Sequence, residues 1–176
     1  MSYTRKLINI AVLIAFGIIL PVAFHFCGGA GSIFLPMHIP VLIAGLLLGM
    51  KGGLAVGVLT PLISSLTTGM PPLMPMLPVM AAELGTYGAV TGYLYRQQRL
   101  PLIWSLLGAM AVGRLVAGLT VAGMVAILGV NLKPLLFVIG AITTGLPGIV
   151  IQMLFVPLLV KRLEAVPGLF KAGENL

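Results

Sequence analysis

The stretch from Leu35 to Arg96 joins apolar character to frequent helix breakers, and it contains LPMHIPVLIAG (35–45), LTPLISSLTTGMPPLMPMLP (59–78), ELGTYG (83–88) and YLYR (93–96). Its hydrophobicity would suit a lipid bilayer, yet prolines occupy positions 36, 40, 61, 71, 72, 75 and 78. Proline removes a backbone donor and breaks helices, and a freed backbone group in lipid is costly unless it faces protein or a water-filled cavity. The stretch therefore predicts where hydrophobic helices stop and a binding site begins.

The composition of the whole chain excludes a soluble protein. It has 176 residues, of which 60% are hydrophobic and 7% charged, with a mean hydropathy of +1.19, whereas soluble domains carry roughly 25% charged residues. The apolar runs are continuous and lack the period-two alternation of a membrane barrel. We therefore expect an all-α integral membrane protein that forms a single domain over residues 1–176.

Six apolar runs predict six transmembrane helices, at about 7–24, 36–50, 54–68, 76–95, 102–128 and 134–160. Lys51-Gly52-Gly53 predicts a tight turn between the second and third helices. No internal repeat is evident, so the inverted-repeat architecture of many transporters is not favoured.

The basic residues predict the orientation of this bundle. Of the ten Lys and Arg residues, Lys133 is expected on the outer side and Arg114 within the membrane. The other eight fall on one side of the membrane, namely Arg5, Lys6, Lys51, Arg96, Arg99, Lys161, Arg162 and Lys171. Such an excess marks the cytoplasmic side. We therefore expect a multi-pass protein of the cell membrane with both termini in the cytoplasm. The net charge of +7 forms no basic face with interleaved aromatics, so nucleic acid is not an expected partner.

Glu83 and Arg114 are charged residues within predicted membrane helices. A charge at the centre of such a helix costs about 2.5–3.5 kcal/mol on insertion scales, so both side chains should face the interior of the bundle. They fall at compatible depths and would be able to pair. One interpretation is a structural ion pair that fixes helix packing, and the other is that one or both contact a polar solute.

Four further polar residues are candidates for the same site. His38 lies between two prolines in LPMHIP, and Tyr87 lies one helical turn from Glu83 on the same face. Gln152 is an amide within a predicted membrane helix and needs a partner, while Asn131 sits in the third outer loop. Each also has a simpler interpretation as a packing or interfacial residue.

Methionines gather in and beside the same stretch, at positions 37, 50, 70, 74, 76 and 80. Methionine fills irregular apolar gaps and adapts its shape. These side chains are either packing and lipid-facing residues or an adaptable wall around a bound molecule.

The chain lacks the residue sets that catalysis or metal binding requires. It has no aspartate, no HExxH, no serine–histidine–acid set and no GxxxxGK[ST] loop. We therefore expect a protein without enzymatic activity, cofactor or metal. If it were a membrane enzyme, Glu83 and His38 would be its acid and base.

Ala11 and Ala15 form a small-xxx-small pair in the first predicted helix. Such pairs let two membrane helices approach closely. The partner would be either another helix of this chain or a separate subunit.

Taken together, LPMHIPVLIAGLLLGMKGG (35–53), LTPLISSLTTGMPPLMPMLPVM (59–80), ELGTYG (83–88) and GYLYR (92–96), preceded by a glycine-rich loop, resemble the substrate-binding S components of energy-coupling-factor (ECF) transporters. The resemblance covers most of the chain and is densest over residues 28–96. It implies a six-helix subunit that captures a vitamin or related micronutrient at the outer face and hydrolyses no ATP.

The resemblance also implies partners and moving parts. S components associate with a membrane T subunit, which contacts a small-xxx-small motif that Ala11 and Ala15 match, and with two cytoplasmic ATPases. Loops at about 25–35, 69–75 and 129–133 would close over the substrate, and the subunit would topple in the membrane to release it.

The substrate is suggested by the form of two motifs. LPMHIP (35–40) and GMPPLMPMLP (69–78) are most similar to the branch assigned to pantothenate, with carriers of cobalamin and of a queuosine precursor as alternatives. Arg114 would suit a carboxylate such as that of pantothenate, although Glu83 would compete for it. A small membrane enzyme and a ligand-free structural protein are the rival interpretations.

Overall fold

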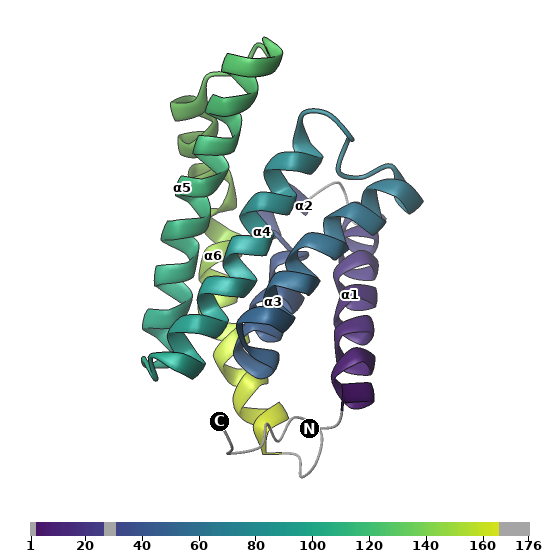
Figure 1. Cartoon of the computed structure of the whole chain (residues 1–176), viewed down its shortest axis with the longest axis vertical. Helices are drawn as coiled ribbons and strands as arrows, with labels where there is room; N and C mark the ends of the chain where they lie inside the picture. The colour runs from purple at the N-terminus through teal and green to yellow at the C-terminus, as the bar shows by residue number, and fades with distance from the viewer. Residues whose placement is uncertain (1–2, 27–30, 166–176) are drawn as a thin grey trace.

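The computed structural model describes residues 3–26 and 31–165, which form helices and connecting loops without any strand. The helices are α1 (Tyr3–Phe26), α2 (Gly31–Phe34), α3 (His38–Thr68), α4 (Met76–Gly92), α5 (Leu102–Leu128) and α6 (Pro134–Glu164), and a π-helical turn, η1 (Tyr93–Gln97), continues α4 (Figure 1). The all-α class is as predicted. Residues 27–30 of the expected loop at 25–35, and Lys171, lie outside the described residues.

Length and apolar composition would allow four helices of the described chain to cross a membrane, at Tyr3–Phe24, His38–Thr68, Leu102–Leu128 and Pro134–Glu164. The start of α1 and the end of α6 lie at the same end of the bundle, and the loops 69–75 and 129–133 lie at the other (Figure 1). Exposed apolar side chains line the outer helices, among them Phe16, Leu119 and Leu154. Such a surface belongs in lipid rather than in water.

The turn expected at Lys51-Gly52-Gly53 is instead made by Gly49. Gly49 has φ 76° and ψ −175° inside α3, a backbone conformation that only glycine adopts without strain. It divides α3 into two arms, and Lys51 to Gly53 already belong to the second. The break frees the Leu46 carbonyl, which accepts a hydrogen bond of 2.6 Å from Arg96 Nε. The sequence prediction misplaced the turn because Gly49, Gly52 and Gly53 are all able to make it.

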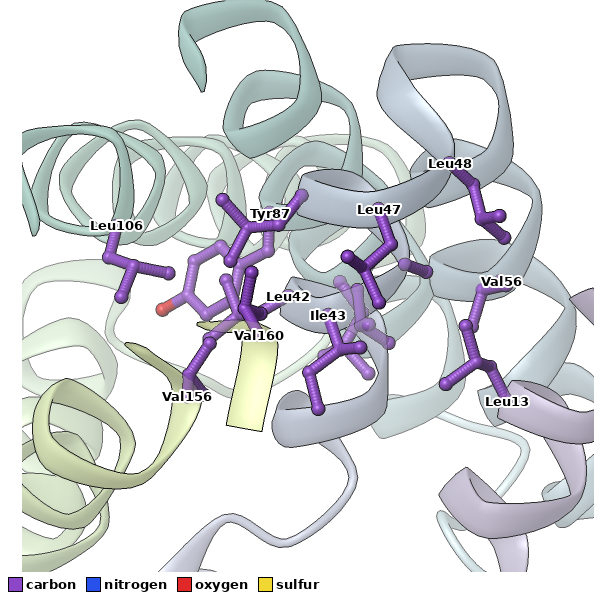
Figure 2. Packing of buried hydrophobic residues seen from close by; sticks show 14 of the residues in the cluster. Leu13, Leu42, Ile43, Leu47, Leu48, Val56, Tyr87, Leu106, Val156 and Val160 are labelled. Carbon is purple, nitrogen blue, oxygen red and sulfur yellow. The ribbon is translucent and has the colours of Figure 1, made fainter. Parts of the chain in front are cut away.

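The first arm of α3 forms the centre of the molecule. Every residue from Val41 to Leu48 is buried, as expected of a helix that is apolar on all sides. Figure 2 shows its side chains packed with Leu13 of α1, Tyr87 of α4, Leu106 of α5 and Val156 of α6. The remaining helices therefore surround a buried helix that starts at His38.

Glycines let the two arms of α3 pack directly on α4. A Cβ added to Gly53 would lie 2.8 Å from the Gly45 Cα and closer still to the Gly88 carbonyl, and one added to Gly88 would lie 2.9 Å from the Gly53 Cα. Real Cβ atoms do not approach backbone so closely. Small residues at helix contacts of this kind bring membrane helices together.

Gly88→Ala is therefore expected to lower the free energy of unfolding by about 1–3 kcal/mol, the usual cost of overpacking. Gly123→Ala is the matched control, because a Cβ at that helical position would meet no atom within 4 Å apart from its chain neighbours and the backbone of its own helix. Thermal unfolding of both variants in one detergent would measure the difference. Equal melting temperatures would show that α3 and α4 are not packed this closely.

Candidate functional site

A cavity of about 650 Å³ lies at the end of the bundle where His38 begins the central arm. Its walls come from segment 35–38, the loop 69–75 and helices α1, α4, α5 and α6. They are mainly apolar, and the polar side chains among them are His38, Glu83, Arg114 and Thr144. The volume and this mixture are typical of sites for small molecules.

The loop 69–75 is held over the cavity by hydroxyl groups at the end of α3. Ser64 Oγ donates to the Met70 carbonyl at 2.7 Å, and Ser65 Oγ donates to the Pro71 carbonyl at 2.6 Å. Gly69, with φ 74°, ends the helix and starts the loop. The hydroxyl-rich end of α3 thus positions Met70 and Pro71, which both line the cavity.

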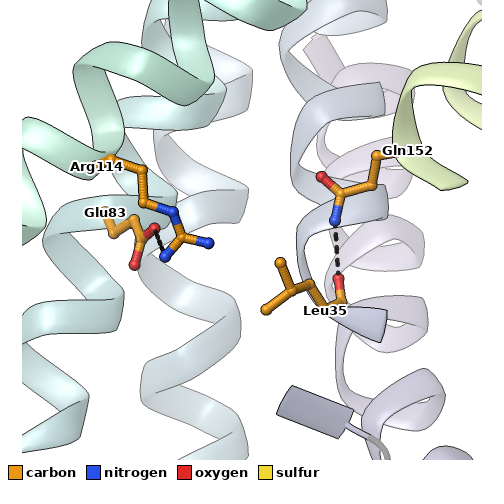
Figure 3. Close-up of polar contacts among 4 residues, drawn as sticks. All are labelled: Leu35, Glu83, Arg114 and Gln152. Atoms are coloured by element: carbon orange, nitrogen blue, oxygen red, sulfur yellow. Dashed lines mark hydrogen bonds and ion pairs between the residues drawn. The ribbon is translucent and has the colours of Figure 1, made fainter. Parts of the chain in front are cut away.

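Glu83 of α4 and Arg114 of α5 form a buried ion pair, with 2.7 Å between Glu83 Oε1 and Arg114 Nη1 (Figure 3). Both residues line the cavity. Arg114 Nε and Nη2 are also buried but make no hydrogen bond within residues 3–26 and 31–165. A buried donor without a partner carries a desolvation cost of about 1–3 kcal/mol. The pair therefore leaves two Arg114 donors without a partner in the described chain, on a residue that lines the cavity.

His38 and Tyr87 stand beside this pair. Their rings pack at a centroid distance of 5.2 Å with a tilt of 60°. Both ring nitrogens of His38 are buried and make no hydrogen bond in the part of the chain that is described. His38 lines the cavity, whereas Tyr87 is not among the lining residues and supports the imidazole ring from α4.

The other two predicted polar residues lie in different surroundings. Gln152 of α6 is buried, and its Nε2 donates a long hydrogen bond of 3.4 Å to the Leu35 carbonyl (Figure 3). Gln152 does not line the cavity itself, but it holds Leu35, which does. Asn131 is exposed in the loop 129–133 and does not line the cavity.

The methionines separate into two groups. Met37, Met70, Met76 and Met80 line the cavity, whereas Met50 and Met74 are 43% and 52% exposed and do not. Four flexible, polarizable side chains around one cavity adapt easily to an apolar ligand surface.

The first part of α6 contributes lining residues that the sequence reasoning missed, namely Leu136, Phe137, Gly140, Ala141 and Thr144. Their pattern resembles that of a lipid-facing helix. The only signal was the hydroxyl group of Thr144 within an apolar run.

Ala11 and Ala15 are both exposed on α1. Neither alanine is therefore buried against another described helix. Gly17 makes the internal contact instead, since a Cβ there would lie 2.5 Å from the Thr60 methyl group.

No three His, Cys, Asp or Glu side chains within the described residues come together as metal ligands would. The cavity instead has an apolar wall, an imidazole ring, and an ion pair in which two nitrogens of Arg114 have no hydrogen-bond partner in the described chain. This arrangement suits the binding of a small amphipathic molecule that carries hydrogen-bond acceptors.

Comparison with known proteins agrees with this arrangement. Residues 5–160 match the family described as ECF transporter, substrate-specific component. Neither the curated proteins nor the solved structures gave a significant match. Since the match covers most of the 176 residues, this multi-pass membrane protein belongs to the substrate-specific components of ECF transporters, the subunits that select the substrate for uptake.

Proposed function

We propose that this chain captures a water-soluble vitamin with high affinity in the cavity that contains His38, Glu83 and Arg114, and that the vitamin is pantothenate. The observation that carries the proposal is the buried Arg114 guanidinium, which has two donors without a partner in the described chain. A carboxylate is the acceptor that a guanidinium binds best. Membership of a family of transport subunits favours this role over a membrane enzyme or a ligand-free structural protein.

Pantothenate fits the chemistry of the walls. Its carboxylate would accept hydrogen bonds from Arg114 Nε and Nη2, and its geminal methyl groups would lie against Met76, Met80 and Phe137, which line the cavity. Its amide and hydroxyl groups would meet His38. Glu83 would keep Nη1 and fix the guanidinium in place. Cobalamin and a queuosine precursor are the alternative substrates.

The remaining predicted residues would act around this contact. Tyr87 would hold the imidazole of His38, and Gln152 would hold Leu35 at the cavity wall. Asn131 would reach the substrate only if the loop 129–133 moved inward. The loops 25–35 and 69–75 would complete the closure.

In the membrane we propose six crossings, made by α1, the two arms of α3, α4 with η1, α5 and α6, in a single domain. Lys6, Lys51 and Arg96 lie together at the end of the bundle opposite the cavity. Basic residues mark the cytoplasmic side, so the cavity would face outward and both termini inward, in the cell membrane. The energising partners would be a T subunit, docked at Ala11 and Ala15, and two ATPases.

The test is to purify the chain in detergent and identify any small molecule that accompanies it by mass spectrometry. Added pantothenate should raise the free energy of unfolding by about 2.7 kcal/mol at one hundred times its Kd. Cobalamin and queuosine precursors serve as comparison ligands. If one of these stabilises the protein instead, pantothenate is wrong while the capture role holds. If no vitamin binds, the capture role fails.

Gly140→Leu offers a second test of the cavity. A Cβ at Gly140 would meet no atom within 4 Å apart from its chain neighbours and the backbone of its own helix, and this residue lines the cavity. A leucine would occupy ligand space without a clash, so affinity should fall by about tenfold or more while the melting temperature stays unchanged. Gly123→Leu is the control, because its surroundings are equally open but lie outside the cavity. Equal affinities in the two variants would place the substrate elsewhere.

A further inference from the structure

A second cavity, of about 280 Å³, lies at the opposite end of the α3 arms from the first. It forms where α1 starts, where α3 turns at Gly49 and where α4 passes into η1. Lys6, Lys51 and Arg96 contribute to its walls, together with Leu48, Gly49, Met50, Gly92 and Gln97. Three helices thus bring three cationic side chains to one hollow.

Close backbone packing fixes the shape of this hollow. A Cβ on Gly92 would lie 2.8 Å from the Met50 Cα, so α4 touches the turn of α3 directly. Arg96 Nε donates to the Leu46 carbonyl at 2.6 Å, which anchors its side chain beside Gly49. Of the guanidinium of Arg96, only Nε is engaged by a hydrogen bond with the described residues.

The described walls of this cavity carry positive charge and no negative charge. No carboxylate is among the described residues that line it, and the ion pair of Glu83 and Arg114 belongs to the other cavity. Like charges held close together repel one another, and a bound anion removes this repulsion. The second arm of α3 also starts at this cavity, and the partial positive charge of a helix start adds to the side chains.

The surroundings indicate the kind of anion. Leu7, Met50 and Leu54 are 48%, 43% and 44% exposed. Met50 lines the cavity, Leu7 follows Lys6 in the sequence, and Leu54 lies about one helical turn after Lys51. They belong to the apolar surface that faces lipid, so the cavity lies at the level of the lipid headgroups. Basic pockets between membrane helices at this depth bind anionic headgroups.

We propose that this cavity binds the phosphate of an anionic phospholipid headgroup, with Lys6, Lys51 and Arg96 as its ligands and Leu7, Met50 and Leu54 against its acyl chains. The site is independent of the substrate cavity and of the substrate's identity. The bound lipid anchors this end of the subunit to the anionic leaflet.

The experiment uses the full chain in a neutral detergent and counts bound lipid by native mass spectrometry. The probes are dioleoylphosphatidylglycerol, dioleoylphosphatidylcholine and inorganic phosphate. Phosphatidylglycerol should be retained and should raise the melting temperature, whereas phosphatidylcholine should do neither. Lys6→Gln with Lys51→Gln should weaken phosphatidylglycerol binding by about 30-fold, as two lost cations near a membrane surface imply.

Lys161→Gln with Arg162→Gln is the control, because it removes the same charge at the same end of the bundle but outside the cavity. Its lipid affinity should stay within about twofold of the parent. Equal loss in both double variants would show unspecific surface attraction and would overturn the site. If inorganic phosphate stabilised the protein as strongly as phosphatidylglycerol, the bound phosphate group would not come from a lipid, and the proposal of a lipid site would fail. Arg96 is left intact in both variants, so the α3 turn keeps its hydrogen bond.

Discussion

Substrate affinity is expected to fall by about 100-fold when Arg114 is replaced by glutamine, because a single hydrogen bond to a charged group contributes about 1.5–3 kcal/mol. Arg114 lines the cavity, and its Nε and Nη2 are buried without a hydrogen-bond partner in the described chain. Isothermal titration of the purified protein with its substrate would measure the loss. Thr144 remains in the wall but cannot replace a cation.

The ion pair complicates this experiment, since Arg114→Gln also leaves Glu83 buried and unpaired. Breaking a buried pair on one side costs about 3–5 kcal/mol of stability. The double variant Glu83→Gln with Arg114→Gln removes both charges and should recover most of that stability. It should not recover substrate affinity, because the guanidinium is still missing.

Glu83→Gln alone supplies the matching control for binding. It keeps the guanidinium and should keep or increase affinity for a carboxylate, since the competing negative charge is gone. A purely structural ion pair would give the opposite pattern, in which the double variant folds and binds like the parent. That result would contradict a ligand contact by Arg114.

The helical class was predictable because long apolar runs leave few other choices for a chain with 7% charged residues. The position of the turn within α3 was not predictable from the sequence. MKGG (50–53) and the preceding Gly49 hold three glycines within five residues, and each has the same intrinsic freedom. Packing against Gly92 decides that Gly49 takes the positive φ, and this contact joins residues far apart in the sequence.

The charged part of the site was predictable for an energetic reason. Charges in lipid are costly, so Glu83 and Arg114 had to face inward, and on neighbouring helices they meet at 2.7 Å. Apolar lining residues carry no such penalty. Met76 in the cavity and Met74 in the exposed loop look alike in hydropathy, so only the fold distinguishes them.

The two amide side chains, Gln152 and Asn131, differ in how far the sequence predicts their surroundings. Gln152 within a membrane helix had to find a partner, and its amide donates to the Leu35 carbonyl. Asn131 lies in a loop at the end of the bundle, where water satisfies an amide at no cost. Nothing in the sequence therefore forced Asn131 toward the cavity, and it is exposed.

Ala11→Leu combined with Ala15→Leu is expected to reduce substrate uptake by at least about tenfold while substrate affinity remains that of the parent. Both alanines are exposed on α1, one turn apart, and their small side chains would let a helix of the T subunit approach closely. Two added leucine side chains would push that helix away, and overpacking of this kind costs about 1–3 kcal/mol per site. Uptake of labelled substrate by cells that also express the energising subunits would measure the effect.

The control must add the same bulk to another exposed position. Ala23→Leu and Ala111→Leu do so, on the same helix and on α5 respectively, because both alanines are exposed. They should leave uptake and affinity unchanged, since a leucine side chain is favourable on a surface that faces lipid. Copurification of the T subunit with each variant then separates docking from transport. If the alanine pair variant still copurifies with the T subunit and transports normally, the docking face lies elsewhere, and the exposed alanines of α1 face only lipid.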